Sequence, residues 1–133
     1  MKIILGSGSP RRKYLLEEMG YSFDVQVSNT DESFDPSMGV YTIAPFLARQ
    51  KANSLIQNIH GADVLICCDT VVIFQNTILG KPKDSQEAYK TINRLSGEMH
   101  EVMSAVCMVK GDQWIEFHET TQILFDDLKK EDI

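Results

Sequence analysis

The stretch Met1-Lys2-Ile3-Ile4-Leu5-Gly6-Ser7-Gly8-Ser9-Pro10-Arg11-Arg12 opens the chain and decides how its fold begins. Residues 1–5 form a short apolar run, which is typical of a buried strand. Glycine and serine then interrupt the run, and Ser9-Pro10 is typical of a helix N-cap followed by proline at the first helical position. The stretch therefore predicts a strand, a tight turn and a helix.

The rest of the chain continues this alternation of helices and strands. We predict that the first helix ends at Gly20, that residues 29–39 form an acidic loop and that 75–77 form a turn. Further helices are predicted over 42–59 and 84–95, and strands over 21–28, 64–68, 71–74, 100–109 and 113–125. Residues 126–133 are compatible with a short terminal helix or with a chain cut short. The pattern predicts an α/β protein with a mixed sheet, in a single domain over residues 1–133.

Composition narrows the class of protein. The 133 residues carry a net charge of -6, which argues against a nucleic-acid polymer as partner because such binders gain affinity from a basic surface. No apolar run is long enough to span a bilayer, so we expect no membrane association and a cytoplasmic location. Local basic groups at Arg11-Arg12-Lys13 and at Lys81 and Lys83 suit a small anion.

Cysteine and histidine spacing indicates no zinc or redox site. Cys67, Cys68 and Cys107 make an odd count without the spacing of a zinc knuckle, and we expect reduced core residues. The three histidines also lack metal-ligand spacing, and we interpret them as structural or surface residues, namely His60, His100 and His118.

The first candidate site is the turn from Gly6 to Arg12. Small residues allow a phosphate to approach the backbone, and free amides at a helix start point towards it. Arg11 and Arg12 add guanidinium groups that bind phosphate oxygens in a bidentate manner. The alternative is an ordinary turn followed by a solvated basic helix end.

Three further positions are candidates. Asp69, placed at the end of an apolar strand, could bind Mg²⁺ or orient water, or it could only cap a turn. Glu32 in the acidic loop is its candidate partner carboxylate, or a solvated charge. In Gly80-Lys81-Pro82-Lys83, Lys81 offers a point charge near a backbone that a ligand can approach, although the local pattern by itself favours an ordinary surface turn.

Five motifs in order are more specific than any one of them. They are Ser7-Gly8-Ser9-Pro10-Arg11-Arg12, Ala48-x-x-Lys51-Ala52, Cys68-Asp69-Thr70-Val71-Val72, Ile78-Leu79-Gly80-Lys81-Pro82 and Leu95-Ser96-Gly97-x-x-His100. This series resembles the Maf family of nucleotide pyrophosphatases, once described as septum formation inhibitors. The resemblance runs over essentially the whole chain.

The resemblance implies a fold like that of the inosine triphosphate pyrophosphatases, with the substrate in a cleft between two lobes. It implies that Asp69 activates water or binds the metal, and that Glu32 also binds the metal. It assigns substrate binding to Ser7, Arg11, Arg12, Lys51, Thr70 and Lys81. The implied cofactor is a divalent cation, Mg²⁺ or Mn²⁺, and a homodimer is the family's usual form.

Arg11 and Thr70 resemble the branch that acts on dTTP and UTP rather than on 7-methyl-GTP. The resemblance therefore implies hydrolysis of a pyrimidine nucleoside triphosphate, normal or modified, to the monophosphate and pyrophosphate. Family members continue into an Asp-Lys-Ala-Gly-x-Tyr-Gly-Ile-Gln motif that has no counterpart here, so we expect the C-terminal part of the fold to be absent. The alternatives are a nucleotide-binding remnant without turnover and a regulatory protein of cell division.

Overall fold

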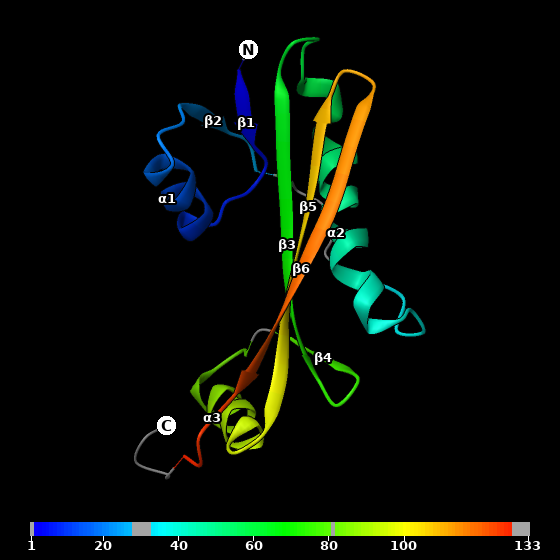
Figure 1. The fold of residues 1–133 in the computed structure, drawn as a ribbon. Helices are drawn as coiled ribbons and strands as arrows, with labels where there is room; N and C mark the ends of the chain where they lie inside the picture. The colour runs from blue at the N-terminus through cyan, green and yellow to red at the C-terminus, as the bar shows by residue number, and fades with distance from the viewer. Residues whose placement is uncertain (1, 28–32, 81, 129–133) are drawn as a thin grey trace.

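The computed structural model describes residues 2–27, 33–80 and 82–128. All the strands in these ranges belong to one mixed sheet (Figure 1). Its described strands run in the order β2-β1-β3-β5-β6, and β4 pairs with β3 beside this path. The strands are β1 (Ile3–Leu5), β2 (Phe23–Val25), β3 (Val64–Phe74), β4 (Thr77–Leu79), β5 (Met99–Lys110) and β6 (Gln113–Leu124). The helices are α1 (Pro10–Glu18), α2 (Val40–Leu55), the 3-10 turn η1 (Ile56–Asn58) and α3 (Ser85–Leu95). The predicted α/β class with a mixed sheet is confirmed.

Parallel and antiparallel pairing meet on β3. Strand β1 runs parallel to both β2 and β3, whereas β3, β5 and β6 form an antiparallel meander. The prediction of two strands interrupted at Asp69-Thr70 is wrong, because the ladder to β5 continues through both residues. Asp69 therefore lies within a strand and not at its end.

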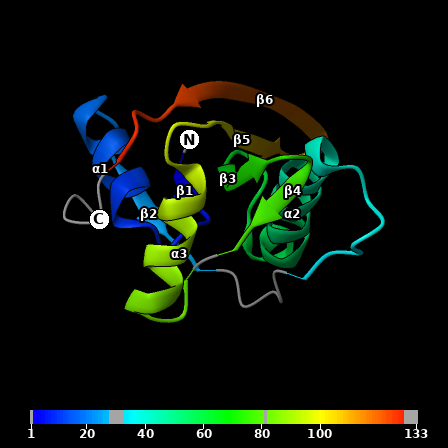
Figure 2. The same cartoon turned by 90° about the horizontal axis from the view of Figure 1, so that it is seen from below.

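The core lies between α2 and one face of β3 and β5. Odd-numbered residues of both strands point to this face, and Leu65, Cys67, Met103 and Cys107 are almost fully buried there. Helix α2 contributes the buried residues Ile43, Ala44, Leu47, Ala48, Ala52 and Leu55. Figures 1 and 2 show α2 on one side of β3, with α1 and α3 on the other side near its two ends. Side chains on β3 therefore reach helices on both sides of the sheet.

Local signals explain the helix boundaries. The Ser9 hydroxyl accepts a hydrogen bond from the backbone N–H of Arg12, with Pro10 at the first helical position of α1. The Asp84 carboxylate caps α3 by accepting from the N–H of Glu87 at 2.8 Å, and the Glu87 carboxylate accepts from the N–H of Lys83. Both predicted helix starts are confirmed.

Two features at the ends of the sheet differ from or extend the predictions. Gln75 and Asn76, both with positive φ, form the two-residue turn of a hairpin that leads into β4, a strand the sequence did not predict. Residues 126–128 are not helical, and the remainder of the predicted terminal helix lies outside the described residues.

Within the described ranges no helix combines the length and apolar character needed to cross a bilayer.

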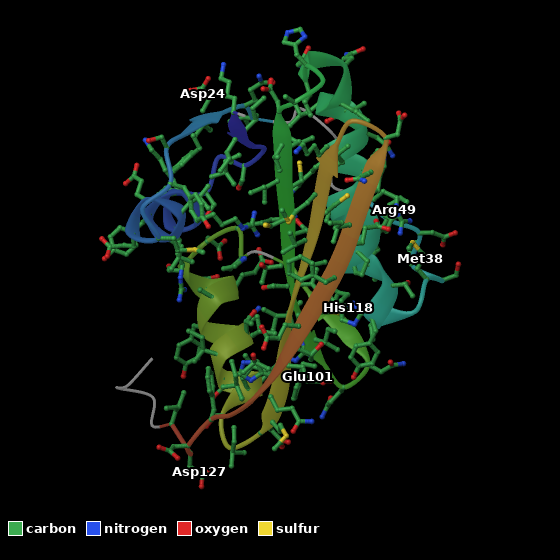
Figure 3. The ribbon with its side chains drawn as sticks, turned by 45° about the horizontal axis from the view of Figure 1, so that its top comes forward. Asp24, Met38, Arg49, Glu101, His118 and Asp127 are labelled. Carbon is green, nitrogen blue, oxygen red and sulfur yellow. The ribbon has the colours of Figure 1, made fainter. Side chains whose placement is uncertain are left out.

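Arg49 ties α2 to the outer strand of the sheet. Its guanidinium forms an ion pair with Glu116 of β6, with 2.7 Å between Nε and Oε1, and Figure 3 shows Arg49 beside that strand. The contact also raises the pKa of Arg49 through its hydrogen bond to Glu116. Because both side chains are well exposed, we expect the pair to contribute little to the free energy of unfolding.

Candidate active site

The candidate site begins at a gap along one edge of β3. On that edge β3 pairs with β1 as far as Ile66 and with β4 from Val72 onwards. Between these two strands, no described strand pairs with residues 67–71 on this edge, although β5 pairs with them on the other edge. The backbone carbonyl of Cys68 in this gap instead accepts hydrogen bonds from Arg12 Nη1 at 3.2 Å and from Lys51 Nζ at 3.3 Å. Cations from helices on opposite sides of the sheet thus converge on one carbonyl group.

Lys51 also forms an ion pair with Asp69. Its Nζ lies 2.8 Å from Asp69 Oδ1, and the two side chains are only 11% and 9% exposed. The register explains the contact, because Asp69 points towards the face of the sheet that α2 covers. The pair holds one carboxylate in a fixed position at the edge of the strand.

Arg12 is held by a network on the other face. Its Nη1 donates to the hydroxyl of Ser7 at 3.1 Å, and its Nη2 donates to that of Thr70 at 3.1 Å. Thr70 Oγ1 in turn lies 3.0 Å from Ser104 Oγ on β5, directly opposite in the ladder. These contacts fix the guanidinium plane while the chain around it remains accessible, which suits recognition of an anion.

Four of these residues line a cleft of about 720 Å³, namely Arg12, Lys51, Asp69 and Thr70, and this volume accommodates a ligand of nucleotide size. One part of the wall is polar and contains Ser9, Arg12, Lys51, Asp69 and Thr70. Another part is mostly apolar and contains Val72, Ile78, Leu79, Leu95 and His100. A ligand with a charged end and a flat, less polar end fits such a lining.

The thiol of Cys68, next to Asp69, lies in surroundings that favour its protonated form. Burial raises the pKa of Cys68, although Arg12 and Lys51 oppose the shift. Burial likewise raises the pKa of Cys67 to about 12. Since the thiolate and not the thiol is reactive, burial disfavours both cysteines as nucleophiles.

The structure brings together five of the predicted site residues: Ser7, Arg12, Lys51, Asp69 and Thr70. Arg11 is exposed on α1 and does not line the cleft. Glu32 and Lys81 lie outside the described residues, although Gly80 and Pro82 beside Lys81 line the cleft. Sequence reasoning missed Ser104, which only the register of β3 against β5 places opposite Thr70.

The sequence profile of one protein family, described as Maf-like protein, matches residues 2–133. The chain belongs to the Maf-like protein family.

Curated relatives cover almost all of this Maf-like chain. A protein of Flavobacterium johnsoniae is 35% identical over 132 residues, which are 99% of this chain and 68% of the relative. A protein of Bacillus cereus is 39% identical over 132 residues, 99% of this chain and 64% of the relative. Both are named dTTP/UTP pyrophosphatase. The chain thus spans about two thirds of the length of these relatives.

Solved structures of other proteins share the fold. A nucleoside-triphosphatase, dITP/XTP pyrophosphatase, from Mycobacterium abscessus has a TM-score of 0.54 at 12% identity and covers 92% of this chain, which in turn covers 73% of that structure. The Ham1 protein of Staphylococcus aureus has a TM-score of 0.54 at 14% identity, with coverages of 92% and 70%. At these identities the likeness concerns the fold alone, and it confirms the predicted relation to this class of pyrophosphatase fold.

The Maf-like cleft presents few protein ligands for a metal ion. Among the described residues no group of three or more His, Cys, Asp or Glu is placed to hold one. Asp69 is the one carboxylate from the described ranges that lines the cleft, and Lys51 holds it through Oδ1. Mg²⁺ in nucleotide sites is bound by one or two carboxylates together with substrate phosphates. The donor set therefore fits a divalent ion that is shared with a bound nucleotide.

Proposed function

We propose that this Maf-like chain hydrolyses a pyrimidine nucleoside triphosphate, dTTP or UTP, to the monophosphate and pyrophosphate. One observation carries the proposal: Arg12 and Lys51 converge on the unpaired edge of β3 beside the buried carboxylate of Asp69. The names of the relatives, dTTP/UTP pyrophosphatase, support the choice of substrate.

The two cations bind the triphosphate and the carboxylate activates water. A triphosphate carries about four negative charges, so an attacking water needs cationic groups that offset them. Asp69, held by Lys51, accepts a proton from a water whose oxygen forms a bond to the α-phosphorus. The bond from that phosphorus to the bridging oxygen breaks, and pyrophosphate leaves with the electron pair. Arg12 and Lys51 stabilise the charge that develops on the leaving group.

Two of the predicted residues, Glu32 and Lys81, lie outside the described residues and keep their proposed roles. Glu32 is proposed to join Asp69 in holding Mg²⁺ or Mn²⁺, and Lys81 is proposed to bind phosphate. Such an ion would offset phosphate charge and polarise a phosphoryl oxygen when bound. Ser7 and Thr70, which were predicted to bind substrate, are proposed to act through Arg12, to which both are hydrogen-bonded. Exposed Arg11 is proposed to reach the outer phosphates.

The single domain over residues 1–133, a homodimer and a cytoplasmic location stay predictions. Each follows from the sequence or from the family resemblance. Size-exclusion chromatography with light scattering measures the oligomeric state directly. A monomer at micromolar concentration would contradict the predicted dimer, but it would not contradict the proposed reaction.

Release of pyrophosphate from UTP and dTTP with Mg²⁺ tests the function. We expect Asp69→Asn, which keeps the shape of the side chain, to lower kcat by about 10²- to 10⁴-fold because it removes the general base. Asp112→Asn, in the exposed turn between β5 and β6, is the matched control and should behave as the parent chain. Turnover of Asp69→Asn within tenfold of the parent would refute the assignment.

Two parallel measurements separate the alternatives. Faster turnover of 7-methyl-GTP than of UTP would overturn the pyrimidine preference. Calorimetric binding of UTP by the parent chain without any release of pyrophosphate would instead favour a nucleotide-binding protein that lacks turnover. A folded parent chain that neither binds nor hydrolyses UTP would refute the proposed function.

A further inference from the structure

His100, near the start of β5, carries an unexplained polar atom. The side chain is 5% exposed, and its Nδ1 has no hydrogen-bond partner. It is the single buried side-chain nitrogen or oxygen in this state within the described ranges. The ring packs edge-on against Phe125 with 4.7 Å between centroids, which fixes its place without using its nitrogens. Since buried polar atoms in folded proteins nearly always have a partner, the missing partner needs an explanation.

The position of His100 relates it to the phosphate-binding end of the cleft. Ser104 lies opposite Thr70 in the ladder, at the level where Arg12 is held. His100 precedes Ser104 by four residues on β5, which at the rise of a strand is a separation of about 13 Å. His100 also lines the same cleft as Arg12 and Asp69. A nucleotide whose phosphates lie at Arg12 can therefore extend its sugar and base towards His100.

The wall between these two ends is suited to a flat ring. Val72 from β3, Leu79 from β4 and Leu95 from α3 line this part of the cleft with apolar atoms. Figure 1 shows α3 beside the end of the sheet at which β5 begins. Ligand sites are typically apolar with a few polar groups that fix orientation, and His100 is a polar residue among these apolar ones.

We propose that His100 is a base-reading residue, which forms a hydrogen bond with the pyrimidine ring of the bound nucleotide. This inference rests on the proposed function. Uracil and thymine present an N–H group between two carbonyl oxygens, and a neutral imidazole has one donor and one acceptor nitrogen. The χ2 torsion of histidine is soft, so the ring can turn a nitrogen towards the base without leaving its slot against Phe125.

Binding by two ligands that differ only in the nucleoside tests the contact. UTP and inorganic triphosphate are titrated calorimetrically into chains that all carry Asp69→Asn, which suspends turnover. His100→Phe keeps an aromatic ring against Phe125 but removes both nitrogens. We expect it to raise the Kd of UTP about tenfold, the loss of one good hydrogen bond, and to leave the Kd of inorganic triphosphate unchanged.

A second variant distinguishes the contact from a packing effect. His100→Asn places a polar atom close to the position of Nδ1, and we expect it to keep the Kd of UTP within about threefold of the His100 chain. An unchanged Kd of UTP in His100→Phe would refute the base contact, but it would not contradict the proposed binding of phosphate at Arg12. Equal weakening of both ligands would also refute it, because a base contact cannot act on a ligand without a base. If neither ligand binds the His100 chain, the proposed function fails and this inference fails with it.

Discussion

The ion pair between Lys51 and Asp69 makes a quantitative prediction about stability and activity together. Replacing Lys51 with methionine keeps the length of the side chain but leaves the carboxylate of Asp69 without its 2.8 Å partner. Breaking a buried pair from one side costs about 3–5 kcal/mol, and we take the lower value because both side chains border a cleft. Lys51→Met should therefore lower the free energy of unfolding by about 3 kcal/mol.

The cost converts into a measurable shift in melting temperature. At about 2.1 cal/mol/K per residue, a chain of 133 residues loses about 10 °C of Tm for 3 kcal/mol. Adding Asp69→Asn to Lys51→Met removes the unpaired charge, so the double variant should recover most of this loss. Both variants should lack pyrophosphate release, because each removes a group from the proposed site.

Thermal unfolding followed by circular dichroism, with a parallel turnover assay, measures all four members of this double-mutant cycle. Arg49→Met is the matched control, since it breaks an ion pair of similar length that is well exposed and should cost less than about 1 kcal/mol. A Tm of Lys51→Met within 2–3 °C of the parent, about 1 kcal/mol or less, would refute the reasoning. So would a double variant less stable than Lys51→Met alone.

Two further predictions concern stability. Gly6→Ala should lower the free energy of unfolding, measured by urea denaturation, by about 1–3 kcal/mol, because its Cβ would lie 2.5 Å from Cys67 Sγ. In the control Gly61→Ala, the added Cβ meets nothing within 4 Å, and the loss should be much smaller. Equal losses would contradict the packing argument. Burial raises the pKa of Cys67 to about 12 and that of Cys107 to about 11. The contribution of each thiol to the free energy of unfolding is therefore full below the pKa of the unfolded state, and it is lost as pH rises towards the pKa of the folded state. Under reducing conditions, the free energy of unfolding should fall by about 1.4 kcal/mol per pH unit for each thiol between pH 9 and 11. In Cys67→Ala the free energy of unfolding should fall less steeply with pH, by that amount. An unchanged slope in this variant would refute the prediction.

Elements with their own local signals could be predicted from the sequence. Helices α1 and α3 begin where Ser9-Pro10 and the Asp84–Glu87 capping pair place them. The β5–β6 hairpin turns at Gly111, whose positive φ of 59° suits glycine. In each case the decisive interaction lies within a few residues of the signal, so no knowledge of the tertiary structure is needed.

The middle of the sheet could not be predicted in the same way. Asp69 and Thr70 form a polar pair that is typical of a strand end, yet pairing with Ala105 and Ser104 carries β3 through them. Strand β4 has three residues and follows a turn made by Gln75 and Asn76 rather than by an Asn-Gly pair. Strand pairing between distant segments decided both outcomes.

The candidate site shows the same division. Neither arginine of the first helical turn is distinguished by sequence spacing, and the helical rotation of about 100° per residue directs only one towards β3. Arg12 takes that position, and Arg11 stays exposed. Ser104 stayed hidden because its link to Thr70 depends on register alone.

The position of Asp69 inside β3 has a consequence for how the site is built. The backbone of Asp69 pairs with β5 on one edge of β3, whereas the other edge is open between β1 and β4. The sheet therefore supplies rigidity from one side and access from the other. Arg12 and Lys51 donate hydrogen bonds to the carbonyl of Cys68 in that opening, and a bound phosphate would compete for the same donors. Substrate binding would thus exchange contacts to the strand edge for contacts to phosphate, without any change in the sheet itself.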